Sequence, residues 1–211
     1  MESKTVSVQT LQRLPVYLNF LEGMQSRGVV NVSATTIAEA LSHNDVQVRK
    51  DLSLVSSGGR PKTGYDINGL ILDIERFLGY DNVNSAVIAG VGNLGRALLS
   101  YECFRAYGLD IVAAFDIDEN KISTTICHKK ILPNGKIKDL CRRMKIKIGI
   151  ITVPAAAAQS ICDDMVEGGV CAIWNLTQTS LKVPDGVFVK NENMACSLAV
   201  LSKHLTENLY Q

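Results

Sequence analysis

The 211-residue sequence predicts an α/β protein with an N-terminal winged helix-turn-helix domain, a Rossmann dinucleotide-binding domain and a C-terminal helix. Three features lead to this prediction: short helical segments followed by a basic glycine-rich stretch, a buried strand that runs into a Gly-x-Gly-x-x-Gly turn, and strands alternating with helices after that turn. We expect the three parts over residues 1–80, 81–192 and 193–211. Since 46% of the residues are hydrophobic, the chain can form a core in each of two small domains.

The first domain is expected to begin with an amphipathic helix over residues 11–24. Its apolar residues recur at three- and four-residue spacings, although Pro15 is unfavourable inside a helix. Two further helices are predicted over 37–41 and 46–55, joined by the polar turn 42–44. A turn of that length is typical of a helix-turn-helix motif, whose second helix enters the major groove of DNA.

The helix over 46–55 is the candidate recognition helix. Asp45 is its predicted N-cap, and hydroxyl groups of residues 33–36 are predicted to cap the helix before it. Gln and Arg side chains suit the edges of bases, and Lys suits phosphate. The residues expected to face away from the apolar side of this helix and to contact DNA are Gln47, Arg49, Lys50 and Ser53.

A glycine-rich stretch over residues 56–65 follows the recognition helix. Arg60 and Lys62 lie within it, and we predict a β-hairpin wing along the DNA backbone or minor groove. The acidic residues of the recognition helix, Asp51 among them, partly offset the basic charge, so DNA binding is expected to require two copies of the domain. An amphipathic helix over 67–78 links this domain to the next.

The strand predicted over residues 85–89 ends at the glycine turn. In this motif Gly90 permits the tight turn, Gly92 lets the backbone approach a pyrophosphate, and Gly95 lets the following helix pack on the strand. That helix, predicted over 96–107, has N–H groups at its N-terminus that favour phosphate. The context therefore predicts a dinucleotide site.

Asp116 follows a second predicted strand, over residues 111–115. It lies 21 residues after Gly95, where a carboxylate accepts hydrogen bonds from the adenosine ribose. Because a carboxylate repels a 2′-phosphate, we expect NAD(H) to be preferred over NADP(H). The nearby Lys121 weakens this preference without reversing it.

Two further strands are predicted over residues 146–153 and 170–174. Pro154 and Asn175 follow their ends, and the ligand of an open α/β sheet lies beyond the carboxyl ends of its strands. The last helix, predicted over 194–205, is apolar on one side. It packs either on its own sheet or on a partner subunit, and the sequence does not choose between them.

The strand ends lack the residues that hydride transfer to a substrate requires. They show no His–Asp pair, no Tyr-x-x-x-Lys and no cysteine placed as a nucleophile, so we predict no catalytic residues and no enzyme activity. The alternative is a small NAD-dependent oxidoreductase whose N-terminal helices only dimerise.

Charge and composition exclude few partners. The net charge of +1 is uninformative about nucleic acid, no apolar run approaches the roughly 20 residues of a membrane span, and the N-terminus lacks the apolar core of a secretion signal. The six cysteines include no C-x-x-C pair and are expected to be reduced core thiols of a cytoplasmic protein. A DNA-binding protein that senses oxidation through these cysteines is the alternative. The dispersed histidines predict no metal site.

Six segments together give the chain a resemblance to the Rex family of bacterial redox-sensing transcriptional repressors. The resemblance covers nearly the whole chain, and the segments in this order are far more specific than any one of them. They are Arg13-Leu14-Pro15-Val16-Tyr17-Leu18, Gln47-Val48-Arg49-Lys50-Asp51-Leu52, Gly64-Tyr65-Asp66, Gly92-Asn93-Leu94-Gly95-Arg96-Ala97-Leu98, Phe115-Asp116-Ile117-Asp118 and Thr152-Val153-Pro154.

The resemblance implies a homodimer whose C-terminal helix is swapped into the partner, and repression from palindromic operators. In the family, NADH closes the dimer, repositions the winged helices and releases DNA, whereas NAD⁺ competes without releasing it. Carried over by motif, Arg49 and Lys50 would lie on the recognition helix, Arg60 and Lys62 on the wing, and Tyr101 would couple the ligand to domain position. The dinucleotide would be held by Gly90, Val91, Gly92, Asn93, Leu94, Gly95 and Asp116, with Val153, Pro154 and Asn175 nearer the nicotinamide.

The chain also departs from the family pattern. Asn19 and Asn193 stand where many members carry an Arg and an Asp, which predicts neutral hydrogen bonds instead of a charged network around Tyr101. Met194 stands where an aromatic residue often seals the nicotinamide pocket, which predicts a looser closure over NADH.

Overall fold

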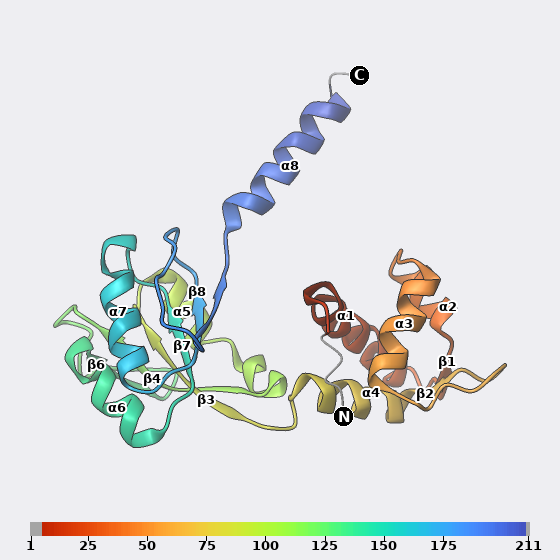
Figure 1. Cartoon of the computed structure of the whole chain (residues 1–211), viewed down its shortest axis with the longest axis horizontal. Helices are drawn as coiled ribbons and strands as arrows, with labels where there is room; N and C mark the ends of the chain where they lie inside the picture. The colour runs from red at the N-terminus through yellow and green to blue at the C-terminus, as the bar shows by residue number, and fades with distance from the viewer. Residues whose placement is uncertain (1–5, 210–211) are drawn as a thin grey trace. The chain divides into compact units, whose positions relative to one another are not determined.

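The computed structural model describes residues 6–209, and its contacts divide the chain into two compact units, Met1–Asn82 and Val83–Gln211. The first unit is helical with a small two-stranded sheet, and the second is built on a seven-stranded sheet with helices (Figure 1). The predicted fold class is confirmed. No helix in the described part of the chain is long and apolar enough to cross a membrane.

The first unit follows the predicted order of helices, with one N-cap that differs. Asn44, not Asp45, is the N-cap of the third helix, because Asn44 is extended and its Oδ1 accepts a hydrogen bond from the Gln47 N–H at 3.2 Å. Asp45 is already helical. The first helix is longer than predicted and continues through Pro15. The elements are α1 (Val8–Gln25), β1 (Asn31–Val32), α2 (Ala34–Ala40), α3 (Asp45–Val55), β2 (Tyr65–Asp66) and α4 (Ile67–Leu78).

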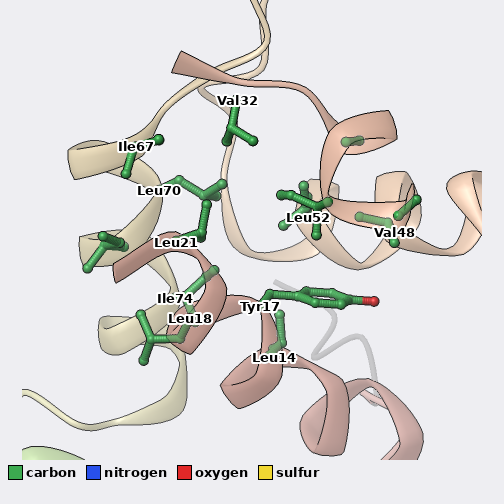
Figure 2. Packing of buried hydrophobic residues seen from close by; sticks show 14 residues of the cluster. Leu14, Tyr17, Leu18, Leu21, Val32, Val48, Leu52, Ile67, Leu70 and Ile74 are labelled. Atoms are coloured by element: carbon green, nitrogen blue, oxygen red, sulfur yellow. The ribbon is translucent and has the colours of Figure 1, made fainter. Parts of the chain in front are cut away.

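Apolar side chains of α1, α3 and α4 meet in a single core (Figure 2). Tyr17 and Leu21 from α1, Leu52 from α3, and Leu70 and Ile74 from α4 are all almost completely buried. Full burial of one such side chain stabilises a fold by about 1.5–3 kcal/mol. The packing of these helices therefore fixes where α3 lies on the surface of the unit.

The second unit has the strand order of a Rossmann fold. Its sheet runs β5-β6-β4-β3-β7-β8-β9, with β5 antiparallel to β6 and the other neighbours parallel. Renumbered in chain order, the six parallel strands read 3-2-1-4-5-6, and ligands of such sheets bind where the order reverses. The elements are β3 (Asn84–Ala89), α5 (Asn93–Leu99), the 3₁₀ helix η1 (Glu102–Tyr107), β4 (Leu109–Asp116), β5 (Thr125–Ile126), β6 (Lys129–Pro133), the 3₁₀ helix η2 (Asn134–Lys136), α6 (Ile137–Met144), β7 (Ile148–Ile151), α7 (Ala155–Glu167), β8 (Ala172–Asn175), β9 (Phe188–Asn191) and α8 (Met194–Leu209).

The central strand β3 is buried on both faces. Val87 and Ala89 pack with buried residues of α6 and α7, whereas Ala86 and Ile88 face the opposite side, where α5 contributes Leu99. Burial on both faces explains why this strand reads as a continuous apolar run and not as an alternating one.

The prediction of one continuous helix over residues 96–107 was wrong, because the structure has two shorter helices there. The α-helix ends at Leu99, and Tyr101 is extended (φ −84°, ψ 93°) before η1 begins. The hydroxyl of Ser100 donates to the carbonyl of Arg96 at 2.9 Å, which satisfies a carbonyl at the helix end locally. Three further elements, β5, β6 and α6, were not predicted.

The last helix begins at the predicted residue and runs four residues further than predicted, to Leu209. All side chains from Ala195 to Glu207 are exposed, including apolar Leu198, Leu201 and Leu205. Of the two packing alternatives, the structure therefore does not show α8 packed on its own sheet. The Met194 side chain lies outside the described residues.

Candidate DNA interface and dinucleotide site

The recognition helix α3 is tied to α1 through the buried carboxylate of Asp51, which is only 1% exposed. Its Oδ2 accepts hydrogen bonds from Arg13 Nε at 2.7 Å and from the Tyr17 hydroxyl at 3.0 Å. Its Oδ1 accepts from Arg13 Nη2 at 2.9 Å, Gln47 Nε2 at 3.0 Å and Thr10 Oγ1 at 3.1 Å. The expectation that Asp51 offsets the basic charge of the DNA face was wrong, because Arg13 already neutralises this carboxylate inside the unit.

The ionisation of this cluster follows from its contacts. Burial raises the pKa of Asp51, but the hydrogen bonds from Arg13, Gln47 and Tyr17 outweigh burial and lower the pKa below its usual value. Burial, followed by the hydrogen bond to the Asp51 carboxylate, raises the pKa of Tyr17 to about 12. Asp51 is therefore charged and Tyr17 neutral at neutral pH.

The outer face of α3 differs from the prediction at one position. Arg49, Lys50 and Ser53 are exposed as expected. Gln47 is half-buried, and its amide donates to Asp51, so it lies on the flank of the helix toward α1. Val46 was not among the predicted residues, but it is exposed on the first turn of α3, in line with Arg49, Lys50 and Ser53 at helical spacings.

Arg49 is held within the helix-turn-helix. Its Nη2 lies 3.0 Å from Asp45 Oδ2 and donates to Thr35 Oγ1 at 3.3 Å. The Arg49 side chain is 63% exposed, and exposed ion pairs of this kind contribute at most about 1 kcal/mol. A phosphate or a base edge can therefore compete for Arg49 at small cost.

The predicted wing has a tight tip. Arg60 and Gly64 exchange two backbone hydrogen bonds, at 2.8 and 2.9 Å, and exposed Lys62 stands between them with a φ of +68°. Gly64 (φ +77°) passes so close to the Val32 carbonyl that a side chain would collide with it. Close packing thus fixes the base of the hairpin and leaves its two cations in solvent.

The strand ends of the second unit are in register at the glycine turn. Ala89 pairs with Phe115 of β4 and with Ile151 of β7, so the residues that follow, Asp116 and Thr152, flank Gly90. The Thr152 hydroxyl donates to the Gly90 carbonyl at 2.7 Å. Thr152 therefore braces the turn, a role that the sequence does not predict.

Each glycine of the turn meets a different constraint. Gly90 has a φ of +94°, and a Cβ there would lie 2.8 Å from the carbonyl carbon of Thr152. A Cβ on Gly95 would collide with the Gly90 carbonyl, whereas a Cβ on Gly92 would meet no described atom within 4 Å. The turn is therefore closed on the inside and open outside Gly92, as the approach of a pyrophosphate requires.

Asp116 closes the turn from the side of β4 and is 8% exposed. Its Oδ2 accepts from the Val91 N–H at 2.8 Å and from Lys121 Nζ at 3.2 Å, and its Oδ1 accepts from the N–H groups of Ile117 and Asp118 at 2.8 and 3.0 Å. Burial raises the pKa of Asp116, but the hydrogen bonds from Asp118, Val91 and Lys121 outweigh burial and lower the pKa. A ribose hydroxyl would have to share or replace one donor, and Lys121 is the side chain among them that can move.

The residues that follow β7 differ in burial from Asn175, the last residue of β8. Val153 is half-buried and Pro154 is exposed, at the start of α7. Asn175 is fully buried: its Nδ2 donates to the Thr179 carbonyl at 2.8 Å and to Asn191 Oδ1 at 2.7 Å, and its Oδ1 accepts from the Thr177 hydroxyl at 2.7 Å. Asn175 lies at the strand end as predicted, but its polar groups hold the loop after β8.

The structure does not bring Tyr101 to the strand ends of the dinucleotide site. Its ring packs edge-on against Phe104 at 4.9 Å between centroids, and Phe104 packs in turn against Trp174 at 6.0 Å. With Leu109 and Asp110, at the start of β4, Tyr101 lines a surface pocket of about 440 Å³. Its coupling role stays a prediction.

The cysteines are less buried than expected. Cys141 and Cys162 are core residues, and burial raises the pKa of both thiols, that of Cys141 to about 11. The expectation of core thiols was wrong for the others, which are Cys103, Cys127, Cys171 and Cys196, all exposed. Within the described residues, no group of three or more His, Cys, Asp or Glu side chains is placed to hold a metal ion.

Comparisons with known proteins find matches to both units of the chain. Residues 81–179 match the family model described as CoA binding domain, and residues 5–53 match the one described as putative DNA-binding protein N-terminus. The chain is 40% identical over 192 residues to the redox-sensing transcriptional repressor Rex of Porphyromonas gingivalis, across 91% of this chain and 88% of that protein. It is 37% identical over 207 residues to the Rex repressor of Bacteroides fragilis, across 98% and 94%.

Solved structures of RSP, a Rex-family repressor, are similar over almost the whole chain. The complex of RSP with β-NAD⁺ and operator DNA has a TM-score of 0.91 and 31% identity, across 99% of this chain and 96% of that chain. The complex with β-NADH has a TM-score of 0.88, across 99% and 98%.

Proposed function

The chain belongs to the Rex family of redox-sensing transcriptional repressors, and we propose that it binds operator DNA through its first unit and leaves the DNA when NADH binds its second unit. One observation carries this proposal. A single chain combines an exposed basic face on a recognition helix with a glycine turn braced by a buried carboxylate. RSP, its relative, has been solved both with operator DNA and with NADH.

On the DNA side, we assign the contacts to α3 and the wing. Arg49, Lys50 and Ser53 present donors to the major groove, and Arg60 and Lys62 contact the backbone or the minor groove. Gln47 contributes a base contact only if its amide leaves Asp51 or reaches past it.

On the dinucleotide side, the pyrophosphate lies over the open side of Gly92 and Asp116 accepts from the adenosine ribose. Val153 and Pro154 flank the nicotinamide, and Asn175 supports that end of the site through the loop after β8. The residues of the glycine turn that we propose contact the dinucleotide are Gly90, Val91, Gly92, Asn93, Leu94 and Gly95.

We assign α8, within residues 193–211, to homodimerisation. Leu198, Leu201 and Leu205 recur at three- and four-residue spacings and are exposed, and an apolar stripe of this kind is stable in water only when another surface covers it. A helix exchanged between two copies would cover it. A two-fold dimer presents two recognition helices, so the operator is palindromic.

The switch requires a difference in affinity. NADH must bind the DNA-free arrangement of the dimer more tightly than the DNA-bound one, and operator DNA then weakens NADH binding by the same factor. Moving most of the population takes roughly a 10²- to 10⁴-fold preference. The uncharged dihydronicotinamide enters an apolar pocket at lower cost than the cationic ring of NAD⁺, which gives a physical basis for sensing the ratio of the two.

This function involves no catalysis. The relatives are named as repressors, and turnover would need an acid or a base beside the nicotinamide. With DNA and NADH as its ligands, the protein acts in the cytoplasm. Steady oxidation of NADH by a small carbonyl compound would favour the oxidoreductase alternative instead.

The proposal is tested by a gel shift on a palindromic operator, titrated with NADH and with NAD⁺. NADH is expected to release the DNA and NAD⁺ to leave it bound. Arg49→Ala should weaken DNA binding and keep NADH affinity, whereas Asp116→Ala should weaken NADH binding or relax selection against NADPH. Replacing all six cysteines should leave NADH-dependent release intact, which separates this function from cysteine sensing. Operator binding that ignores NADH would refute the proposal.

A further inference from the structure

The DNA-facing side of α3 carries an apolar side chain among its cations. Val46 is 58% exposed, whereas Val48, two residues along the same helix, is completely buried in the core. Val46 lies three and four residues before Arg49 and Lys50, both exposed, so the three side chains are neighbours on the helix surface.

Neither the fold of the unit nor helix propensity explains a valine at this position. The core contains the other face of α3 and does not include Val46. Valine is also a weaker helix former than alanine or the long polar residues, since its β-branched side chain loses rotamers in a helix. An isolated exposed valine is ordinary on a protein surface. On the helix face proposed to contact DNA, an exposed valine needs a chemical counterpart in the groove.

That counterpart is the methyl group of thymine. Val46 is the second residue of α3, and the N-terminal residues of a recognition helix are the ones that reach base edges in the major groove. Thymine is the base that presents a methyl group in that groove, and small apolar side chains contact it. The flanking cations hold the helix against phosphates and hydrogen-bonding base edges, while Val46 offers no hydrogen bond of its own.

We propose that Val46 packs against the C5-methyl group of a thymine in each operator half-site. This contact raises the affinity for operators that have thymine at that position. The inference rests on the proposed function, because it requires operator binding by α3. It adds a specificity-determining residue that recognises a base by apolar contact, beside Arg49 and Lys50, which recognise charge and hydrogen-bond acceptors.

The test removes the methyl group from the DNA and the isopropyl group from the protein. Operator duplexes are first selected from a random library with the purified full-length chain. Each thymine of the selected half-site is then replaced in turn by deoxyuridine, which lacks only the methyl group. Binding of the wild type, Val46→Ala and the control Leu54→Ala is measured by fluorescence anisotropy. Leu54 is also exposed (39%) on α3, but it lies near the C-terminal end of the helix.

The expected result is a single sensitive thymine in each half-site. Deoxyuridine there should weaken wild-type binding about fourfold per half-site, the effect of one methyl-sized group leaving an apolar contact. Val46→Ala should weaken binding to the thymine operator and should respond less than the wild type to deoxyuridine at that position. Leu54→Ala should keep the full sensitivity of the wild type. Circular dichroism checks that both variants are folded.

Two other outcomes are informative. If the wild type and Val46→Ala respond equally to deoxyuridine at every thymine, Val46 does not contact a methyl group, and the inference is overturned while DNA binding stands. If no duplex is selected and the wild type does not bind DNA, the proposed function fails, and this inference fails with it.

Discussion

The two units of the chain each contain a buried aspartate that ties two segments together, and they do so in different ways. Asp51 accepts its hydrogen bonds from side chains, including Arg13, which is 38 residues away in the sequence. Asp116 accepts three of its four hydrogen bonds from backbone N–H groups, those of Val91, Ile117 and Asp118. The first carboxylate depends on a particular set of side chains, and the second depends mainly on the course of the backbone.

Because of this difference, we expect the two sites to tolerate amino-acid substitutions unequally. Backbone donors remain present in any sequence that keeps the glycine turn, so the brace around Asp116 resists most substitutions of neighbouring side chains. The cluster around Asp51 loses a charge or a donor with every substitution of its members. Because the cluster joins α1 to α3, we expect damage there to reach the DNA face, while damage at the glycine turn should reach the dinucleotide.

The largest effect is expected from Arg13→Met, which leaves the Asp51 carboxylate buried without its counter-charge. Breaking a buried ion pair by removing one partner costs about 3–5 kcal/mol of unfolding free energy. Chemical denaturation followed by circular dichroism measures this loss in the first unit. Arg13→Lys, which keeps a positive charge, should lose less. The exposed control Lys62→Met should change stability by less than about 0.5 kcal/mol. Equal losses in Arg13→Met and Lys62→Met would contradict the role of the cluster.

A pH effect of roughly 2–3 kcal/mol is expected from Tyr17, whose pKa rises to about 12 through burial and its hydrogen bond to Asp51. The folded state holds the proton more tightly than the unfolded chain, so this contribution is complete below pH ~10 and is lost as the pH rises towards 12. Stability of the first unit is measured across this range. Tyr17→Phe should remove this part of the alkaline loss, and the control Tyr65→Phe should retain it.

The contribution of Asp51 to stability changes with pH in the opposite direction. Its lowered pKa gives a contribution that is present above the ordinary value for an aspartate and is lost as the pH falls through the lowered pKa of the folded state. A first unit that gained stability on acidification through this range would contradict the ion pair with Arg13.

A smaller effect on stability separates two glycines of the turn. Gly95→Ala forces a methyl group against the Gly90 carbonyl and should cost the second unit about 1–3 kcal/mol, with loss of NADH binding. Gly92→Ala meets open space at a φ of −79° and should leave stability nearly unchanged. Its methyl group would occupy the space proposed for the pyrophosphate, so NADH affinity measured by fluorescence should still fall. Unchanged affinity would remove Gly92 from the site.

Elements with strong local signals were predicted well. The helix predicted over residues 67–78 matches α4 at both ends, because Asp66 caps its start, Gly79 takes the left-handed conformation at its end, and its apolar residues share one face. By contrast, the hairpin of β5 and β6 and the short helix α6 were missed. These segments are brief and polar, and β6 is defined by its pairing with β4 and β5.

The two candidate sites show the same contrast between features set by local sequence and features set by long-range packing. The glycine turn and Asp116 were predicted with their positions at the strand ends, since the motif specifies a local turn and the next strand supplies the acid. The orientation of Gln47 and the part played by Asp51 were not predicted. The part played by Asp51 depends on Arg13 and Tyr17, which reach α3 only when α1 packs against it, and Gln47 donates to the same carboxylate from one turn earlier on α3.

The sequence by itself determined the two-unit organisation, the helix α3 and the glycine turn with its acid. These follow from periodicity, capping and spacing, which act over a few residues along the chain. Only the tertiary structure decided that Asp51 is the internal counter-ion of Arg13 and that Tyr17 donates to the same carboxylate. The packing of separate helices decided them, because it brings together side chains that no local pattern in the sequence relates to one another.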